Sequence, residues 1–216
     1  MRSLILFLIL AANVRAGSLP YAKERLVQYG QGHLYLVQEP RGGPKKARGI
    51  FIYAHGGGGR EEQGMDVNHY SRTFFRLRTL LNLRNFIYVC PRWAHFPSLI
   101  KELKKRYGGL PIYLAGASAG GALVYDETAK AKRRYHGILL LCPALSSKYS
   151  KKLPPKLPPL YVVSGEKDLL ITRFCRKLAA QRGTGKFRYE EIAGGNHDAP
   201  LKQANWRKAL AFLTKP

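Results

Sequence analysis

Short apolar runs alternate along the chain with segments of helical periodicity. Six runs of apolar and β-branched residues are bounded by Gly, Pro or Asp and predict strands at residues 49–54, 86–90, 111–115, 137–142, 160–164 and 187–192. Most are apolar throughout, as expected for parallel strands that are buried on both faces. Residues 33–38 instead alternate between apolar and polar positions, which predicts an antiparallel strand at the edge of the sheet.

The segments between these runs carry apolar residues at helical spacing. In the first, Leu77 and Leu81 mark an apolar face, and Arg72, Arg76 and Arg78 are expected to face solvent. Further helices are predicted around residues 99–105, from 118 to about 134, and over 171–181 and 201–213. The alternation predicts an α/β fold with a mostly parallel central sheet flanked by helices. The Pro-rich residues 148–160 predict an extended basic loop.

The N-terminus has the pattern of a secretory signal peptide. A basic start at Arg2 is followed by an apolar run over residues 4–12 and by the small-x-small triplet Val14-Arg15-Ala16. The run is too short to cross a bilayer, which needs about 20 residues as a helix. We therefore predict a signal peptide over residues 1–16, one domain over residues 17–216, a secreted or periplasmic protein, and no transmembrane anchor.

Composition changes this picture mainly through charge. The 216 residues are 45% hydrophobic and 23% charged, which is typical of a globular protein, but the net charge is +24. Such an excess favours nucleic acid, an anionic surface or an acidic polymer as partner. No nucleic-acid motif accompanies it, and the basic residues form no single stripe. We expect general surface charge, with anionic polymers or cell-surface material as the favoured partners, and the sequence leaves the oligomeric state open.

The segment with the most chemical information is Gly116-Ala117-Ser118-Ala119-Gly120, which joins a predicted strand to a predicted helix. The flanking glycines permit a sharp turn that lifts the Ser118 hydroxyl above the sheet, at the positive end of the following helix. The pattern alone is common, and its position between a strand and a helix gives it weight. Ser118 is the candidate nucleophile.

A run of glycines follows the first parallel strand, at His55-Gly56-Gly57-Gly58-Gly59. Its N–H groups could stabilise an oxyanion, with Gly57 or Gly58 giving one donor and Ala119 the other. A phosphate-binding loop or a flexible turn are the other interpretations. A nucleotide P-loop ends in Gly-Lys-Ser/Thr, whereas this run continues into Arg60, so that interpretation fails.

Two further strand ends carry an acid and a base. Asp168 follows one strand within a Gly-x-x-Asp sequence, and His197 follows the last strand after a pair of glycines. A carboxylate in this position can fix the tautomer of a histidine. The chain order Ser, Asp, His is the one expected for this type of turn. Glu166 and Asp198 remain open as alternative acids.

Together these motifs resemble the α/β-hydrolase superfamily, from about residue 49 to the C-terminus. The glycine run and the residues after it look most like secreted esterases of the polyhydroxybutyrate-depolymerase, feruloyl-esterase and dienelactone-hydrolase types. Residues 116–121 are also similar to hormone-sensitive-lipase-like enzymes, which usually carry Asp where Ala117 stands. The resemblance implies a catalytic triad of Ser118, His197 and Asp168, and an oxyanion hole from Gly57, Gly58 and Ala119. It implies no metal and no other cofactor.

The expected function is a serine hydrolase, most simply a carboxylic ester hydrolase. A serine peptidase of the prolyl-oligopeptidase clan and a non-catalytic basic binding module are the alternatives. The short interval between the sixth and seventh strands of the superfamily predicts no cap domain and an open site. His55, Arg60 and Trp93 are candidate substrate contacts, with a buried core aromatic as the alternative for Trp93.

The three cysteines, Cys90, Cys142 and Cys175, are too few for a disulfide framework. In the superfamily's strand order two strands separate Cys90 from Cys142, a gap too wide for a disulfide. We expect none of the three to be catalytic.

Overall fold

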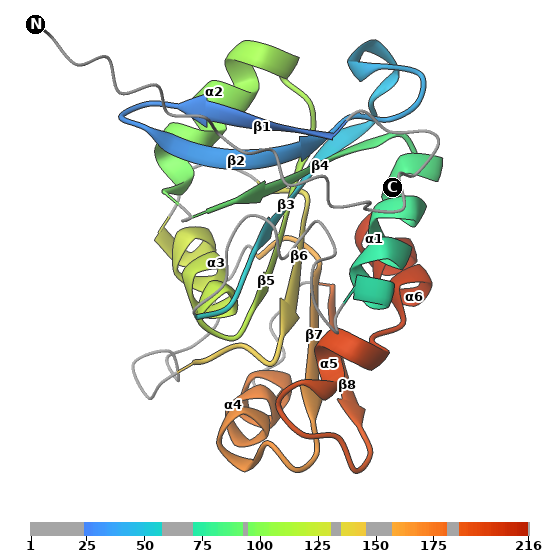
Figure 1. Ribbon diagram of the computed structural model, residues 1–216. Coiled ribbons are helices and arrows are strands. Elements are labelled where there is room, and N and C mark those ends of the chain that lie inside the picture. The colour runs from blue at the N-terminus through green and yellow to red at the C-terminus, as the bar shows by residue number, and fades with distance from the viewer. Residues whose placement is uncertain are drawn as a thin grey trace, which may run out of the picture.

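The computed structural model describes residues 24–57, 71–92, 95–130, 135–145, 157–180 and 186–215. Its strands form one eight-stranded sheet in the order β1-β2-β4-β3-β5-β6-β7-β8 (Figure 1). The strands are β1 (Glu24–Tyr29), β2 (His33–Gln38), β3 (Gly49–Ala54), β4 (Phe86–Pro91), β5 (Ile112–Ala117), β6 (Gly137–Leu141), β7 (Leu160–Gly165) and β8 (Phe187–Ile192). Strands β3 to β8 pair in parallel, whereas β1 and β2 are antiparallel to their neighbours. The predicted fold class is confirmed.

Helices cover both faces of this sheet, as Figure 1 shows. They are α1 (Ser71–Leu83), α2 (Phe96–Tyr107), α3 (Ala119–Lys130), α4 (Leu169–Ala180), α5 (Ala199–Gln203) and α6 (Trp206–Leu213), and a 3-10 turn, η1, spans Pro44–Lys46. Residues of α2, α3 and α4 pack in the core of one face, and residues of α1 and α6 pack in the core of the other. Within β3, Ile50 and Ile52 point to the first core, and Phe51 and Tyr53 point to the second. Two cores explain why the central strands are apolar at every position.

The sheet extends one strand further than the sequence pattern indicated. Residues 33–38 do form an antiparallel strand, but β2 lies between β1 and β4 and is therefore not the edge. The edge strand is β1, whose residues alternate irregularly between buried and exposed and so give little periodic signal. The two strands form a hairpin that pairs Tyr29 with His33.

The expectation that Arg78 faces solvent is wrong. Its side chain is only 4% exposed, and its guanidinium pairs with the Glu24 carboxylate at 2.5 Å. The partner comes from β1, the strand that the pattern did not reveal. A buried charge is tolerated when it is paired, so the hairpin makes the inward position of Arg78 acceptable.

The single helix predicted over residues 201–213 is in fact two helices. Ala204 has an extended backbone, with φ −53° and ψ 135°. The side chain of Asn205 then accepts a hydrogen bond from the Lys208 N–H at 3.0 Å and caps α6. Asparagine is a preferred N-cap residue, so the break between α5 and α6 has a local cause that helical periodicity does not report.

Several expectations fall on residues outside the described ranges. They concern the signal peptide over residues 1–16, most of the loop at 148–160 and the end of the third predicted helix at 131–134. Within the described residues, no helix combines the length and apolarity that a bilayer crossing requires.

Candidate active site

Ser118 lies in a strained turn between β5 and α3. Its φ is 49°, a left-handed value that side-chain-bearing residues rarely adopt. The main chain is fixed by three hydrogen bonds: the Ser118 N–H donates to the Leu141 carbonyl at 3.0 Å, and the Ser118 carbonyl accepts from Ala122 at 3.1 Å and Ala144 at 2.9 Å. Strand β6 and the turn after it therefore hold the candidate nucleophile in place.

Glycines make this turn sterically feasible. A Cβ on Gly116 would lie 2.4 Å from the carbonyl oxygen of Gly120, and a Cβ on Gly120 would lie 2.2 Å from that of Ala54. Both distances are far below van der Waals contact. The first turn of α3 can approach the end of β3 only because residue 120 lacks a side chain.

The loop after β3 lies against the same turn. A Cβ on Gly56 would be 3.4 Å from the Cβ of Ser118. The amide N–H groups of Gly57 and Ala119 donate to no hydrogen bond within the described ranges. A small cavity of about 30 Å³ separates this loop from the start of α3, with Leu123 and Pro91 in its wall. Two N–H groups without a partner among the described residues thus lie near the Ser118 turn, and such groups are the kind of donor that an oxyanion requires.

His55 connects this loop to the end of the neighbouring strand β4. The side chain is buried, and its Nε2 contacts the carbonyl oxygen of Arg92, just past β4. Its Nδ1 lies 2.8 Å from the carbonyl of Gly56. Both neighbours are acceptors, and a neutral imidazole can donate to only one of them. His55 thus contacts the loop backbone and the neighbouring strand end, and it also lines the small cavity between this loop and α3.

The loops after β7 and β8 form a single unit. Lys167 N–H donates to the Gly195 carbonyl at 2.7 Å, and Gly194 N–H donates to a carboxylate oxygen of Glu166 at 2.6 Å. A Cβ on Gly165 would lie 2.2 Å from the carbonyl oxygen of Asn196. The two loops that make this close contact hold Asp168 and His197.

Asp168, His197 and Ser118 form one chain of hydrogen bonds. His197 Nδ1 lies 2.5 Å from Oδ2 of Asp168, and His197 Nε2 lies 3.1 Å from Oγ of Ser118. With Nδ1–H donating to the carboxylate, Nε2 is the acceptor available to the Ser118 hydroxyl. The Asp168 side chain is 15% exposed and that of His197 is 44% exposed. The histidine is therefore accessible from solvent, while its acid partner is mostly covered.

The two alternative acids have other partners. The Glu166 carboxylate accepts the Gly194 N–H, and Asp198 pairs with Lys202 at 3.5 Å, one helical turn further on. Of the three carboxylates considered from the sequence, Asp168 is the one for which a hydrogen bond to His197 is found.

A polar network that the sequence pattern did not indicate lies where β7 meets α4, on both sides of Asp168 in the chain. The Thr172 hydroxyl reaches Ser164 Oγ at 3.0 Å and the Gly165 carbonyl at 2.7 Å. Ser164 Oγ lies 2.8 Å from the Tyr189 hydroxyl, which donates to Glu191 at 2.7 Å. Burial raises the pKa of Tyr189, so its phenol stays protonated and able to donate. The network joins α4, β7 and β8 below the acid, and no spacing in the sequence indicates it.

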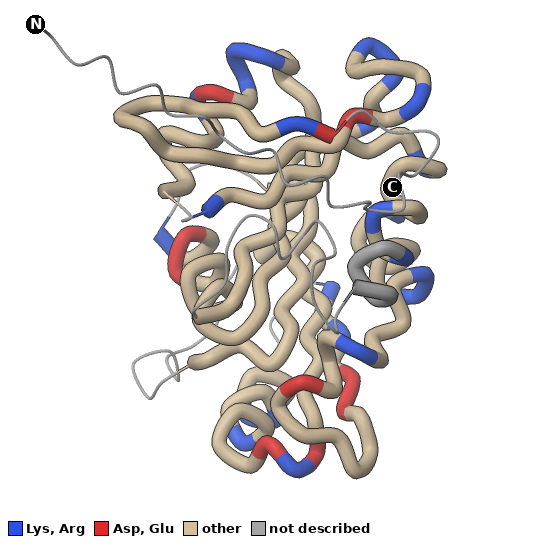
Figure 2. Tube along the Cα trace, in the orientation of Figure 1, with Lys and Arg blue, Asp and Glu red and all other residues tan. Residues whose placement is uncertain are grey.

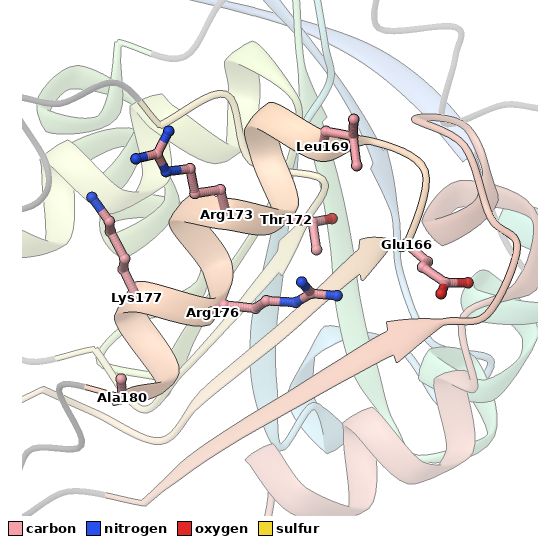
Figure 3. Close-up of a pocket in the computed structure, with 7 residues that line it drawn as sticks. All are labelled: Glu166, Leu169, Thr172, Arg173, Arg176, Lys177 and Ala180. Carbon is pink, nitrogen blue, oxygen red and sulfur yellow. The ribbon is translucent and has the colours of Figure 1, made fainter.

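A concavity of about 540 Å³ runs along α4 from Glu166 to Ala180, close to Asp168 in the chain (Figure 3). Arg173, Arg176 and Lys177 give it a basic surface. Arg176 is already bound by Glu191, through Nε at 2.9 Å and a terminal nitrogen at 2.6 Å. Apart from Glu166, every lining residue in the described part of the chain comes from α4.

Three of the candidate residues, Gly58, Arg60 and Trp93, lie outside the described residues. In the part of the chain that the structure describes, no three His, Cys, Asp or Glu side chains are grouped as metal ligands would be. The cysteines Cys90, Cys142 and Cys175 are free and buried. Two strands, β3 and β5, separate β4, which holds Cys90, from β6, which precedes Cys142, as expected.

Comparison with known proteins finds similarity in structure only. No protein-family model matches the sequence, and no curated protein matches it. Many solved structures match the fold. One is a mutant of the feruloyl esterase module from Clostridium thermocellum complexed with sinapinate, at 14% identity and a TM-score of 0.70, covering 89% of this chain and 88% of that one.

Two other solved structures are similar over nearly their whole length. The S-formylglutathione hydrolase of Staphylococcus aureus has 14% identity and a TM-score of 0.65, covering 89% of this chain and 97% of that one. The dienelactone hydrolase of Anabaena variabilis has 16% identity and a TM-score of 0.61, covering 90% of this chain and 93% of that one. The strand order, the turn at Ser118 and these matches together show that the chain has the α/β-hydrolase fold.

Proposed function

We propose that the protein is a serine hydrolase that cleaves carboxylic esters through an acyl-enzyme intermediate. The observation that carries this proposal is the chain of hydrogen bonds from Asp168 through His197 to Ser118. Such a chain supplies a nucleophile, a general base and a group that orients the base. The esterases and hydrolases among the solved structures of the same fold support the reaction class.

In the proposed reaction, Ser118 Oγ attacks the ester carbonyl while His197 Nε2 takes the hydroxyl proton. The negative charge that develops on the carbonyl oxygen is stabilised by the N–H groups of Ala119 and of Gly57 or Gly58, with the positive end of α3 behind Ala119. His197 then gives its proton to the leaving alcohol. A water molecule, deprotonated by the same histidine, releases the acid and restores Ser118.

Asp168 has two roles in this proposal. Its carboxylate keeps the proton of His197 on Nδ1, so that Nε2 faces the serine as a base. It also stabilises the imidazolium that forms during each half-reaction. The hydrogen-bonded unit of the two loops, through Lys167 and Gly195, supports this arrangement because it fixes the acid relative to the base.

We further propose that the protein is exported through the signal peptide at residues 1–16 and acts on esters of anionic polymers or cell-surface material. The charge of +24 supports this partner class. Figure 2 displays Lys and Arg on α2, α4, α6 and the connection between β2 and β3. Charge spread in this way attracts an extended polyanion, and it predicts a steep salt dependence with a polymeric anionic ester but not with a small neutral ester.

The test is hydrolysis of a panel of nitrophenyl esters and peptide anilides by the protein, by Ser118→Ala and by Ser98→Ala. We expect ester turnover that Ser118→Ala abolishes and Ser98→Ala retains, because Ser98 lies on α2 and contacts His95 instead of the triad. A serine-directed phosphonate should add once per chain, at Ser118. Preference for anilides would favour a peptidase. Absence of both turnover and adduct would favour a binding module and would refute the proposal.

A further inference from the structure

A groove of about 550 Å³ lies between α1 and the segment that holds α5 and α6. In Figure 1, α1 and α6 lie together on the side of the sheet opposite α3, and α1 contacts both α5 and α6. Its volume is within the range of ~300–1,000 Å³ that is typical of small-molecule sites. None of its described lining residues belongs to the candidate triad or to the glycine loop, so these residues form a surface distinct from the candidate active site.

Apolar side chains form the floor and one rim of this groove. Trp206 is buried at 4% exposure, and Leu80 is partly buried against the same core. Leu83, in the last turn of α1, is 74% exposed and is one of few large apolar residues in the described ranges that face solvent to this extent. An aliphatic chain laid along these residues would remove apolar surface from water without displacing any core contact.

Two arginines line the same groove from its opposite walls. Arg76 belongs to α1 and Arg207 to α6. Both are exposed, and in the described residues neither makes a hydrogen bond or ion pair. By contrast, Arg78 on α1 and Arg176 on α4 each have a carboxylate partner. The described lining contains no Asp or Glu, so within it the groove combines an apolar floor with positive charge that has no carboxylate partner.

We propose that this groove binds an anionic amphiphile, namely a medium-chain carboxylate such as dodecanoate. The guanidinium groups of Arg76 and Arg207 hold the carboxylate, because planar guanidinium matches its two oxygens. The alkyl chain lies over Leu80, Leu83 and Trp206. A neutral amphiphile lacks the charged contact, a cationic one is repelled, and a short acid lacks the apolar contact.

The experiment measures quenching of Trp206 fluorescence by bromododecanoate, below its critical micelle concentration. The chain has two tryptophans, so the Trp93→Phe variant leaves Trp206 as the reporter. We expect saturable quenching that is reversed by dodecanoate, but not by acetate or dodecyltrimethylammonium. Binding needs no catalysis, so the result is independent of the ester-hydrolase proposal.

Substitutions then separate the charged and the apolar contributions. Arg76→Gln and Arg207→Gln should each weaken binding of the carboxylate by about tenfold, as expected for the loss of a charge-assisted contact. Leu83→Ser should weaken it several-fold while the exposed position leaves the fold intact, which a thermal melt checks. Arg173→Gln is the matched control, because Arg173 is an exposed arginine on α4, outside this groove, and should bind as the parent does.

Three results would overturn the proposal. One is quenching that rises linearly without saturation, which indicates unspecific adsorption of the amphiphile. Another is equal binding by the parent and the Arg76→Gln/Arg207→Gln double variant. The third is absence of quenching. If it is accompanied by a dimer in sedimentation that Leu83→Ser converts to a monomer, the groove is covered by a second copy of the chain.

Discussion

The carboxylate of Asp168 lies 2.5 Å from Nδ1 of His197, although the two are 29 positions apart in the chain. The contact depends on the pairing of β7 with β8, whose register runs from Leu160↔Phe187 to Gly165↔Ile192. Because the two strands are parallel and in register at their ends, the loops that follow them leave the sheet at the same level. Asp168 and His197 lie within hydrogen-bond distance for that reason.

Asp168→Asn should lower kcat for a nitrophenyl ester by about 10³–10⁴-fold with little change in KM, because the amide favours the wrong tautomer of His197. Steady-state kinetics across pH measure this effect. Asp198→Asn removes a neighbouring carboxylate that pairs with Lys202 and should keep near-parental kcat. If the two variants lost activity equally, the assignment of the acid would be wrong.

Gly120→Ala should destabilise the fold by about 2 kcal/mol or more, because the new Cβ would lie 2.2 Å from the Ala54 carbonyl oxygen and 2.3 Å from that of His55. Urea unfolding gives the free energy. Gly109→Ala is the matched control, since a Cβ there meets nothing within 4 Å, and its effect should stay within about 0.5 kcal/mol. Equal stability of the two variants would contradict the close approach of α3 to β3.

Acidification should weaken the link between α4 and β8. The hydrogen bonds from Arg176 lower the pKa of Glu191 below its usual value. The folded pKa is thus lower than the unfolded one, so the stabilisation is complete above the unfolded pKa of ~4.3 and is lost as pH falls through the folded pKa. Arg176→Gln should reduce the drop in Tm between about pH 5 and pH 3. Arg173→Gln, on the same helix, should leave that drop unchanged, and a parental drop in Arg176→Gln would refute the link.

The cysteines should resist alkylation in the folded protein. Burial raises the pKa of both Cys142 and Cys175 to about 12, so at pH 8 almost none of either thiol is thiolate. Iodoacetamide at pH 8 should label neither under native conditions, and mass spectrometry should find both labelled in denaturant. Rapid native labelling of Cys142, which follows β6 close to Ser118 in the fold, would contradict its burial.

The sequence predicted most of the sheet, and it singled out the three side chains that the hydrogen bonds of Asp168, His197 and Ser118 join, because both leave local signals. Strands buried on two faces are apolar at every position, and a turn such as that at Ser118 requires glycines at fixed positions. Other features depend on partners that are distant in sequence. Arg78 is buried because Glu24 reaches it from β1, and Thr172 contacts Ser164 across the interface of α4 with β7. Periodicity cannot report such pairs, since each residue alone is typical of an exposed position.

The candidate site is divided between two parts of the sheet. The main chain of Ser118 is bound to Leu141 at the end of β6, whereas Asp168 and His197 follow β7 and β8. The parts join at the pairing of β6 with β7, which has four partnered positions and ends at Leu141↔Val163. A small change in sheet twist at this junction would alter the distance from His197 to Ser118 while leaving each part intact. The rate of the proposed ester hydrolysis would therefore respond to strain in the sheet that is too small to cause detectable unfolding.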